Sequence, residues 1–195
     1  ISAKYELNEK QNLRFGASKT YTLPQFKETA PFIYEEINQQ KIGNKDLYPS
    51  DDYNFDLKWE YFPKSEEVFA VTAFGKYIQN PINEITIASS INDVSFVNTG
   101  DTGYATGAEL EIRKNIFSQN KENGAKISSG LNISYLYTSQ DLDAEKIQRE
   151  TNYNVAFTDT KSAFTGASDL LVNADVTYFK EWNDKNTSLT STLAF

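Results

Sequence analysis

Residues 53–61 read Tyr53-Asn54-Phe55-Asp56-Leu57-Lys58-Trp59-Glu60-Tyr61. Apolar and aromatic residues alternate strictly with polar and charged ones, which is typical of a β-strand whose two faces meet different surroundings. A strand of about ten residues that is tilted by about 40° rises about 25 Å, the height of the apolar band on a transmembrane β-barrel. The stretch therefore predicts one strand of a membrane-spanning barrel wall.

The composition is compatible with this prediction and excludes other classes. The formal net charge is −8, and such a surface does not favour nucleic acid, whose phosphates are bound by Lys and Arg. A run of about eighteen apolar residues, which a helical membrane span needs, does not occur in the sequence. Barrel strands need no such run, because only every second residue faces lipid.

Cysteine and histidine are both absent from the chain. Their absence excludes disulfides, thiolate zinc sites, a Cys nucleophile and a Ser-His-Asp triad. We therefore expect neither catalytic residues nor a cofactor or metal site. The chain also begins at Ile1 without a basic and apolar leader, so we expect a mature product or a fragment.

Alternation and turn-forming residues predict about eight strands. They are expected at residues 2–7, 12–23, 52–62, 67–80, 94–117, 126–139, 168–182 and 187–195. Short connections at 8–11, 63–66, 118–125 and 183–186 alternate with long ones near 24–51, 81–93 and 140–167. This asymmetry is typical of outer-membrane barrels, which have short periplasmic turns and long extracellular loops. The expected fold is all-β, an antiparallel transmembrane barrel segment.

Charged residues recur on the polar faces of the expected strands, which suits a hydrated or plugged lumen. The candidates for lumen-facing or plug-facing residues are Arg14, Asp56, Lys58, Glu60, Glu109, Glu111 and Arg113. Two interpretations remain open. The charges pair with one another between neighbouring strands, or some of them contact a plug inside the barrel.

Aromatic residues are expected near both ends of the strands. If the short turns are periplasmic, the inner interface contains Trp59, Tyr61 and Trp182, and the outer one contains Tyr21, Tyr53, Tyr104, Tyr135 and Tyr137. Two such belts are typical of membrane barrels. The alternative is that these aromatics form the core of a soluble sheet.

The expected strand order also places both chain ends on the side of the long loops. A complete barrel of this kind normally has both termini in the periplasm. Residues 1–195 are therefore expected to form one partial barrel domain, an interior piece of a larger barrel.

Several segments together resemble a known family. They include Asn12-Leu13-Arg14-Phe15, Gly43-Asn44-Lys45-Asp46-Leu47-Tyr48-Pro49-Ser50, Asn54-Phe55-Asp56-Leu57-Lys58-Trp59-Glu60-Tyr61-Phe62-Pro63 and Gly107-Ala108-Glu109-Leu110-Glu111. The collinear series over residues 12–138, with a weaker continuation at 168–178, resembles the second half of the barrel of TonB-dependent outer-membrane receptors. The similarity is greatest to receptors of the Bacteroidetes type.

The resemblance implies a barrel of about twenty-two strands in the outer membrane of a Gram-negative cell, filled by a plug domain. It also implies uptake of a scarce ligand, such as an iron chelate, cobalamin or an oligosaccharide. The expected partners are outer-membrane lipid, the plug of the same receptor, the ligand and, through the plug, the TonB complex. The plug and the closing strands are expected to lie outside this chain.

Ligand contacts are expected in the long loops, because binding residues concentrate there. The aromatic candidates are Phe32, Tyr34, Tyr48 and Tyr153. Alternatively, these side chains pack against each other.

Three readings from other classes compete with a receptor. Asp101-Thr102-Gly103 matches the triplet of aspartic proteases, which work with two carboxylates, but the chain contains one copy. Glu109 and Glu111 share a strand face at about 6–7 Å, a spacing that suits glycoside hydrolysis. The third reading is a soluble all-β module that binds carbohydrate or another ligand through residues 140–167. We favour the receptor and expect no enzymatic activity.

Overall fold

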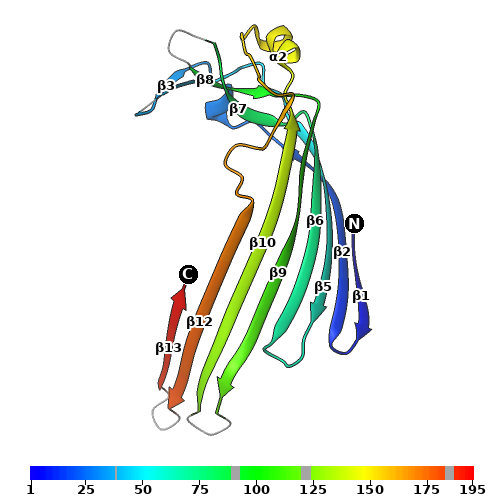
Figure 1. The fold of residues 1–195 in the computed structure, drawn as a ribbon, viewed down its shortest axis with the longest axis vertical. Helices are drawn as coiled ribbons and strands as arrows, with labels where there is room; N and C mark the ends of the chain where they lie inside the picture. Colours follow the sequence, from blue (N-terminus) through cyan, green and yellow to red (C-terminus); the bar gives the residue numbers. More distant parts are fainter. Residues whose placement is uncertain (38, 89–92, 120–123, 183–186) are drawn as a thin grey trace.

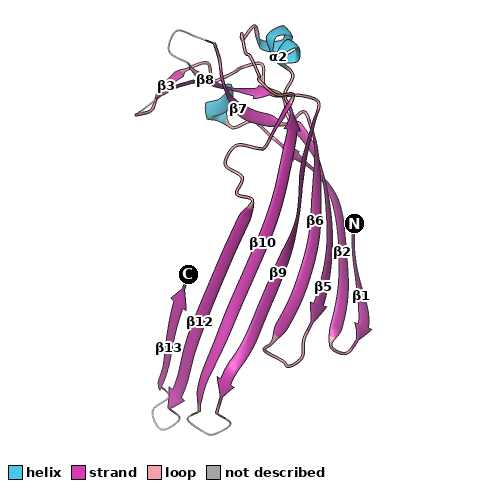
Figure 2. Ribbon diagram, viewed as in Figure 1, coloured by secondary structure: helices cyan, strands magenta, loops and turns pink. Residues whose placement is uncertain are grey.

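The computed structural model describes residues 1–37, 39–88, 93–119, 124–182 and 187–195. Long strands form one curved sheet, and a smaller sheet with two short helices lies at one end of it (Figure 1, Figure 2). In the part of the chain that is described, no helix has the length and apolar character needed to cross a membrane.

The main sheet follows the order of the sequence, and each strand on its path pairs antiparallel with the next. Its strands are β1 (Ser2–Asn8), β2 (Gln11–Thr22), β5 (Ser50–Tyr61), β6 (Val68–Gln79), β9 (Thr102–Ser118), β10 (Ala125–Asp141), β12 (Leu170–Trp182) and β13 (Thr187–Ala194). A short strand, β11 (Lys161–Ser162), pairs with the end of β10. The sheet does not close on itself within the described residues. The predicted antiparallel barrel segment of about eight strands is thus confirmed.

Short and long connections alternate along the main sheet, as predicted. The chain turns tightly between β1 and β2 and between β5 and β6, whereas long connections join β2 to β5, β6 to β9 and β10 to β12. The predicted turn at 118–125 lies partly outside the described residues, and the one at 183–186 lies wholly outside them.

One face of the main sheet is apolar and exposed. The strand register aligns Leu13, Trp59, Val71 and Leu110 in a row that crosses four strands. Phe55 and Leu57 belong to the same face, where they are 52% and 48% exposed. Contiguous exposed apolar surface of this extent is uncommon on soluble monomers. The face therefore suits surroundings that are themselves apolar.

Aromatic side chains cluster near opposite ends of β5, in agreement with the expected positions along the strands. Trp59 stacks on Tyr61 at a ring-centroid distance of 6.4 Å, close to the short turn. Toward the other end, Tyr77 lies 6.0 Å from Tyr53 and 5.4 Å from Tyr104. The assignment of these clusters to membrane interfaces remains a prediction.

Three long connections, residues 23–49, 80–101 and 142–169, join strands of the main sheet. Their described residues up to Thr160 fold together into what we term the loop subdomain, whereas the third connection from β11 to Asp169 runs beside β10. The loop subdomain contains the small sheet, ordered β3 (Ile33–Glu35), β4 (Gln40–Ile42), β8 (Val94–Asn98) and β7 (Ile82–Thr86), with α1 (Phe26–Thr29) and α2 (Ala144–Thr151). Strands β4 and β8 come from different connections and pair in parallel. The loop subdomain is therefore one packed unit at the end of the main sheet (Figure 1).

The hydrophobic core lies in the loop subdomain. A cluster of buried side chains consists of Ile85, Ile87, Val97, Ile147 and Val155, with Ile42 packed against it. Of the buried apolar residues in the described part of the chain, Ala70 alone belongs to the main sheet. This distribution agrees with a sheet whose apolar face is turned outward.

The predicted strand at 94–117 is wrong, because the structure divides it into β8 and β9, which belong to different sheets. The backbone N–H of Thr99 donates to the carbonyl of Pro81, and the Thr99 carbonyl accepts from Asp143, so the chain bends between the two strands. At Gly100 a Cβ atom would lie 2.5 Å from the Asp141 carbonyl oxygen. All residues of β8 are buried. This strand therefore lacks the alternation of apolar and polar residues that marks the long strands of the main sheet.

The space around two glycines of the main sheet predicts that an added methyl group is costly at one position and tolerated at the other. A Cβ atom at Gly107 would lie 2.2 Å from the Tyr135 carbonyl oxygen, whereas at Gly75 the nearest atom, in Thr106, is 3.8 Å away. Gly107→Ala should destabilise the sheet by about 1–3 kcal/mol through overpacking. Gly75→Ala should stay within about 1 kcal/mol of the unsubstituted protein. Urea unfolding midpoints of the full-length receptor in lipid vesicles measure both, and equal midpoints would contradict this account of the packing.

Candidate functional site

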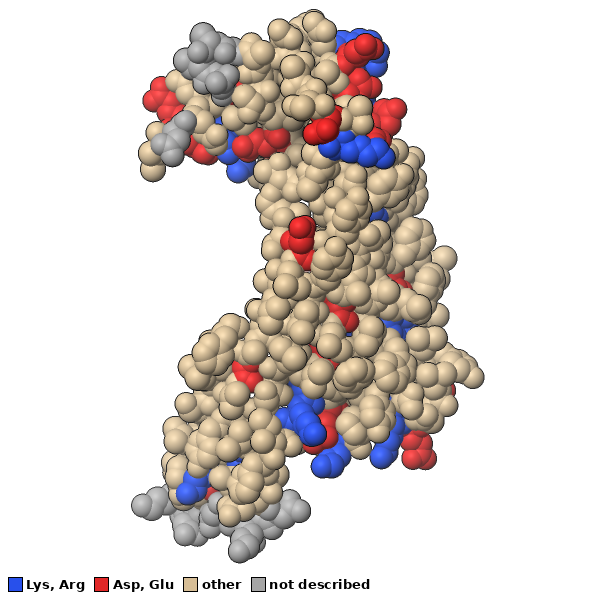
Figure 3. Space-filling view, viewed as in Figure 1, with Lys and Arg blue, Asp and Glu red and all other residues tan. Residues whose placement is uncertain are grey.

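Two surfaces contain the residues that the sequence indicates for function. One is the polar face of the main sheet, and the other is the loop subdomain. In the view of Figure 3, charged side chains gather at the loop subdomain and at the opposite strand ends, with scattered ones between.

A network of ion pairs crosses the polar face. Arg14 Nε donates to Glu60 Oε2 at 2.8 Å. Lys58 Nζ lies 3.6 Å from Glu60 Oε1 and 3.5 Å from Glu111 Oε2. Arg113 Nε lies 3.2 Å from Glu111 Oε1. We call these five residues the charge network, and it links β2, β5 and β9.

The charge network passes over β6, which lies between β5 and β9 in the sheet. The residue of β6 that is in register with both Glu60 and Glu111 is Ala70, which is 1% exposed. Because Ala70 is small, Lys58 reaches Glu111 across the intervening strand. The pairing of charges between strands is therefore present in the structure.

The remaining two candidates on the polar face, Asp56 and Glu109, make no ion pair among the described residues. Both are exposed. A Cβ atom at the neighbouring Gly16 would lie 3.6 Å from Asp56 Oδ2, so the glycine leaves space beside this carboxylate. Glu109 differs from Glu111, which two cations hold, so the two glutamates are not equivalent in charge environment.

A groove of about 360 Å³ lies at the short-turn end of this face. Its lining includes Glu66, Arg113, Lys126 and Asp175. Glu66, in the turn between β5 and β6, accepts hydrogen bonds from Lys126 and from Asn115, and the hydrogen bond from Lys126 contributes most to lowering the pKa of its carboxyl group. The groove thus contains charges of both signs, part of them already paired.

The four aromatic candidates in the loops have different surroundings. Phe32, just before β3, is 59% exposed, and Tyr34 in β3 is half-buried. The Tyr48 hydroxyl donates to Glu150 Oε2 at 3.2 Å, and burial raises the pKa of this hydroxyl. Tyr153 packs against the core cluster. Phe32 is therefore the most accessible of the four, while Tyr48 and Tyr153 contribute to the interior of the loop subdomain.

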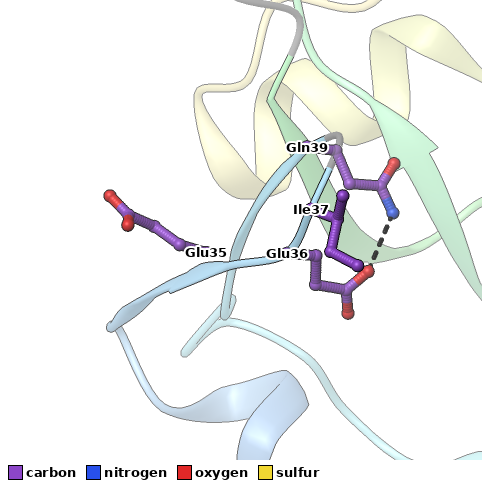
Figure 4. Close-up of a pocket in the computed structure, with 4 residues that line it drawn as sticks. All are labelled: Glu35, Glu36, Ile37 and Gln39. Carbon is purple, nitrogen blue, oxygen red and sulfur yellow. Dashed lines mark hydrogen bonds between the residues drawn. The ribbon is translucent and has the colours of Figure 1, made fainter.

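The sequence did not indicate the hollow at the tip of the β3–β4 hairpin. It is lined by Glu35, Glu36, Ile37 and Gln39, and Glu35 points away from the other three (Figure 4). Gln39 Nε2 donates to Glu36 Oε2 at 3.2 Å, and Ile37 is fully exposed. The only indication of this hollow in the sequence is the pair Glu35 and Glu36 before Ile37, which is a weak signal for a site.

Lys146 on α2 was also missed. Its ammonium group is buried and donates to the Gly100 carbonyl at 2.9 Å, to Asp101 Oδ1 at 2.9 Å and to Asn80 Oδ1 at 3.2 Å. The hydrogen bond from Lys146 lowers the pKa of Asp101. Burial acts to lower the pKa of Lys146, but the hydrogen bond to Asp101 and the interaction with Tyr48 outweigh it, so the net shift is upward.

The environment of Asp101 also bears on the protease triplet. Asp101 is 83% exposed and forms an ion pair with Lys146 at 2.9 Å. Aspartic proteases need two carboxylates that share a proton. An aspartate paired with an ammonium group is a structural ion-pair partner, and it does not perform that chemistry.

Comparison with known proteins identifies the family. The model of the family described as TonB dependent receptor-like, beta-barrel, matches residues 1–193. Solved structures that match include variants of the ferric enterobactin receptor PfeA from Pseudomonas aeruginosa, one of them in complex with enterobactin. Each is 14% identical, with a TM-score of 0.48, and the match covers 99% of this chain and 31% of that chain.

This chain therefore spans about a third of the length of the PfeA structures. No curated protein matches the sequence. The family is one of receptors and transporters, and its barrels are outer-membrane proteins. Because the family model covers almost the whole sequence, the chain belongs to the TonB-dependent receptor-like β-barrel family.

Proposed function

We propose that the chain is an interior piece of the C-terminal half of the barrel of an outer-membrane receptor of the Bacteroidetes type, which takes up a scarce ligand with energy transmitted by TonB. The observation that carries the proposal is the exposed apolar face of the main sheet, with Phe55 and Leu57 about half exposed. Lipid against this face would remove it from water, whereas a soluble binding module would leave it hydrated. Family membership supports the same conclusion.

The polar face then lines the inside of the barrel. Within the charge network each ionic group has an oppositely charged neighbour. The network would therefore expose little net charge to the inside of the barrel. Asp56 and Glu109 have exposed carboxylates outside the network. These two are the residues that we assign to contacts with the plug, where cationic or hydrogen-bond-donating groups would complement them.

The loop subdomain would face the outside of the cell and receive the ligand. Phe32 and Tyr34 on its first connection are the aromatic contacts that we propose, since Tyr48 and Tyr153 are engaged within the subdomain. An iron chelate, cobalamin and an oligosaccharide are the ligand classes to test. Aromatic side chains contribute to binding all three through apolar faces and stacking.

The membrane orientation predicts a difference between adjacent positions of β5. Phe55→Arg would place a charge on the lipid face and should cost about 2–4 kcal/mol near the middle of the membrane. Asn54→Arg places the same side chain on the opposite face, where Asn54 already donates to Thr20 Oγ1 at 3.0 Å, and should cost less. The fraction of full-length receptor that folds into lipid vesicles measures both changes.

Two results would contradict the membrane assignment. One is an equal loss of folding for the two arginine variants. The other is recovery of the receptor as a water-soluble monomer that needs neither detergent nor lipid.

The ligand assignment predicts weaker ligand binding when Phe32 and Tyr34 are truncated together. In cells that depend on this receptor, uptake of ferric chelates, cobalamin and oligosaccharides is measured first, to find the ligand that is taken up. The double change Phe32→Ala with Tyr34→Ala should then weaken binding about tenfold, which corresponds to about 1.4 kcal/mol. The control is Phe26→Ala on α1, which removes a side chain that is 79% exposed. Unchanged affinity of the double variant would refute the assignment.

A further inference from the structure

The three connections of the loop subdomain lie far apart in the sequence, yet they share a set of polar contacts. Residues 23–49, 80–101 and 142–169 are separated by paired strands of the main sheet. Loops of this length that stayed independent would each keep much conformational entropy. The contacts between the three connections therefore determine whether they move separately or together.

Lys146 joins the third connection to the second. An ammonium group has three N–H donors, and the three acceptors of Lys146 are the Gly100 carbonyl, Asp101 Oδ1 and Asn80 Oδ1. All three belong to the connection between β6 and β9. Lys146 is only 5% exposed, so its charge depends on these partners for compensation.

Tyr48 joins the first connection to the same helix. Its hydroxyl donates to Glu150 Oε2 on α2 at 3.2 Å and also interacts with Lys146, one turn earlier on α2. The contact spans 102 residues of sequence. A single helix, α2, thus holds one partner in each of the other two connections.

The first and second connections also meet directly, at Tyr48 and Asn98. Asn98 Nδ2 donates to the carbonyls of Tyr48 and Asn80 at 3.0 and 2.9 Å, and Asn98 Oδ1 accepts from the Tyr48 backbone N–H at 3.3 Å. The Asn80 side chain in turn accepts from Lys146. The polar contacts therefore form a closed circuit through all three connections.

The apolar core alone does not explain this arrangement. The buried members of the core cluster come from the second and third connections, and Ile42 of the first lies only partly buried against them. The first connection is held by the short β4–β8 pairing, where Ser95 Oγ donates to the Ile42 carbonyl at 2.8 Å and Lys41 pairs with Glu84 at 2.9 Å. It is also held by the polar contacts of Tyr48 with Asn98, and by Asn44, whose Nδ2 donates to the Phe96 carbonyl at 2.9 Å. The polar circuit joins all three connections by hydrogen bonds, whereas the core cluster includes the first connection only through the partly buried Ile42.

We propose that Lys146 is a positioning residue that couples the three connections of the loop subdomain into one cooperative unit, so that they gain and lose protection from hydrogen exchange together. The inference rests on the proposed function only in that this unit is the surface offered to the ligand. With the unit intact, the ligand meets a preorganised surface, and it does not have to order three separate loops.

Hydrogen exchange of the full-length receptor in lipid vesicles tests the proposal without any ligand. Lys146→Met keeps most of the side-chain volume and removes the charge and all three donors. Amide exchange should rise at least tenfold throughout the described residues of the loop subdomain, with the strands of the main sheet unchanged. The matched control is Lys161→Met in the third connection, where Lys161 is 63% exposed and 3.7 Å from Asp141 Oδ1, and exchange should stay as in the unsubstituted receptor.

A second variant keeps the test decisive if Lys146→Met prevents folding. Tyr48→Phe removes one hydroxyl and keeps the ring, so exchange should rise in all three connections together, by less than in Lys146→Met. The proposal is overturned if Lys146→Met raises exchange around α2 alone, or if Tyr48→Phe raises exchange in the first connection alone or in no connection. Because these measurements need no ligand and no uptake, their failure is distinct from a failure of the proposed function.

Discussion

The structure depends on the antiparallel register of the main sheet. Side chains alternate between the two faces of a strand, so a shift of one residue in any pair would exchange the apolar and the charged faces. The register places Leu13, Trp59, Val71 and Leu110 in one row. The same register places Glu60, Ala70 and Glu111 in a row on the other face. The apolar face of the main sheet and the charge network on its polar face thus both follow from a single hydrogen-bonding pattern.

The long strands of the main sheet could be predicted from the sequence because each is amphipathic and pairs with the long strand that precedes or follows it in the chain. Strand β5 is an example, since the alternation from Tyr53 to Tyr61 defines its faces without knowledge of any other strand. The candidate charges could be found in the same way. Their partners could not, since Lys58 meets Glu111 across an intervening strand, and that contact depends on the size of Ala70 in a third segment.

The fold of the loop subdomain could not be predicted from the sequence, for a different reason. Its strands contain three to five residues each, β8 is buried throughout, and β4 pairs with β8 from another connection. Periodicity needs longer segments to be informative. Lys146 shows the same limit, because a lysine in a polar segment is usually a solvated side chain. Its burial follows from acceptors on a connection that precedes it by more than forty residues.

The separation of 102 residues between Tyr48 and Glu150 has a consequence for how the protein reaches this state. Contacts between distant residues form slowly, because closing the intervening chain costs entropy before the contact stabilises anything. Pairing of β5, β6, β9 and β10 in sequence brings the two residues close and removes most of that cost. We therefore expect a direction in folding: the main sheet forms first, hairpin by hairpin, and the loop subdomain packs last, on a sheet that is already assembled.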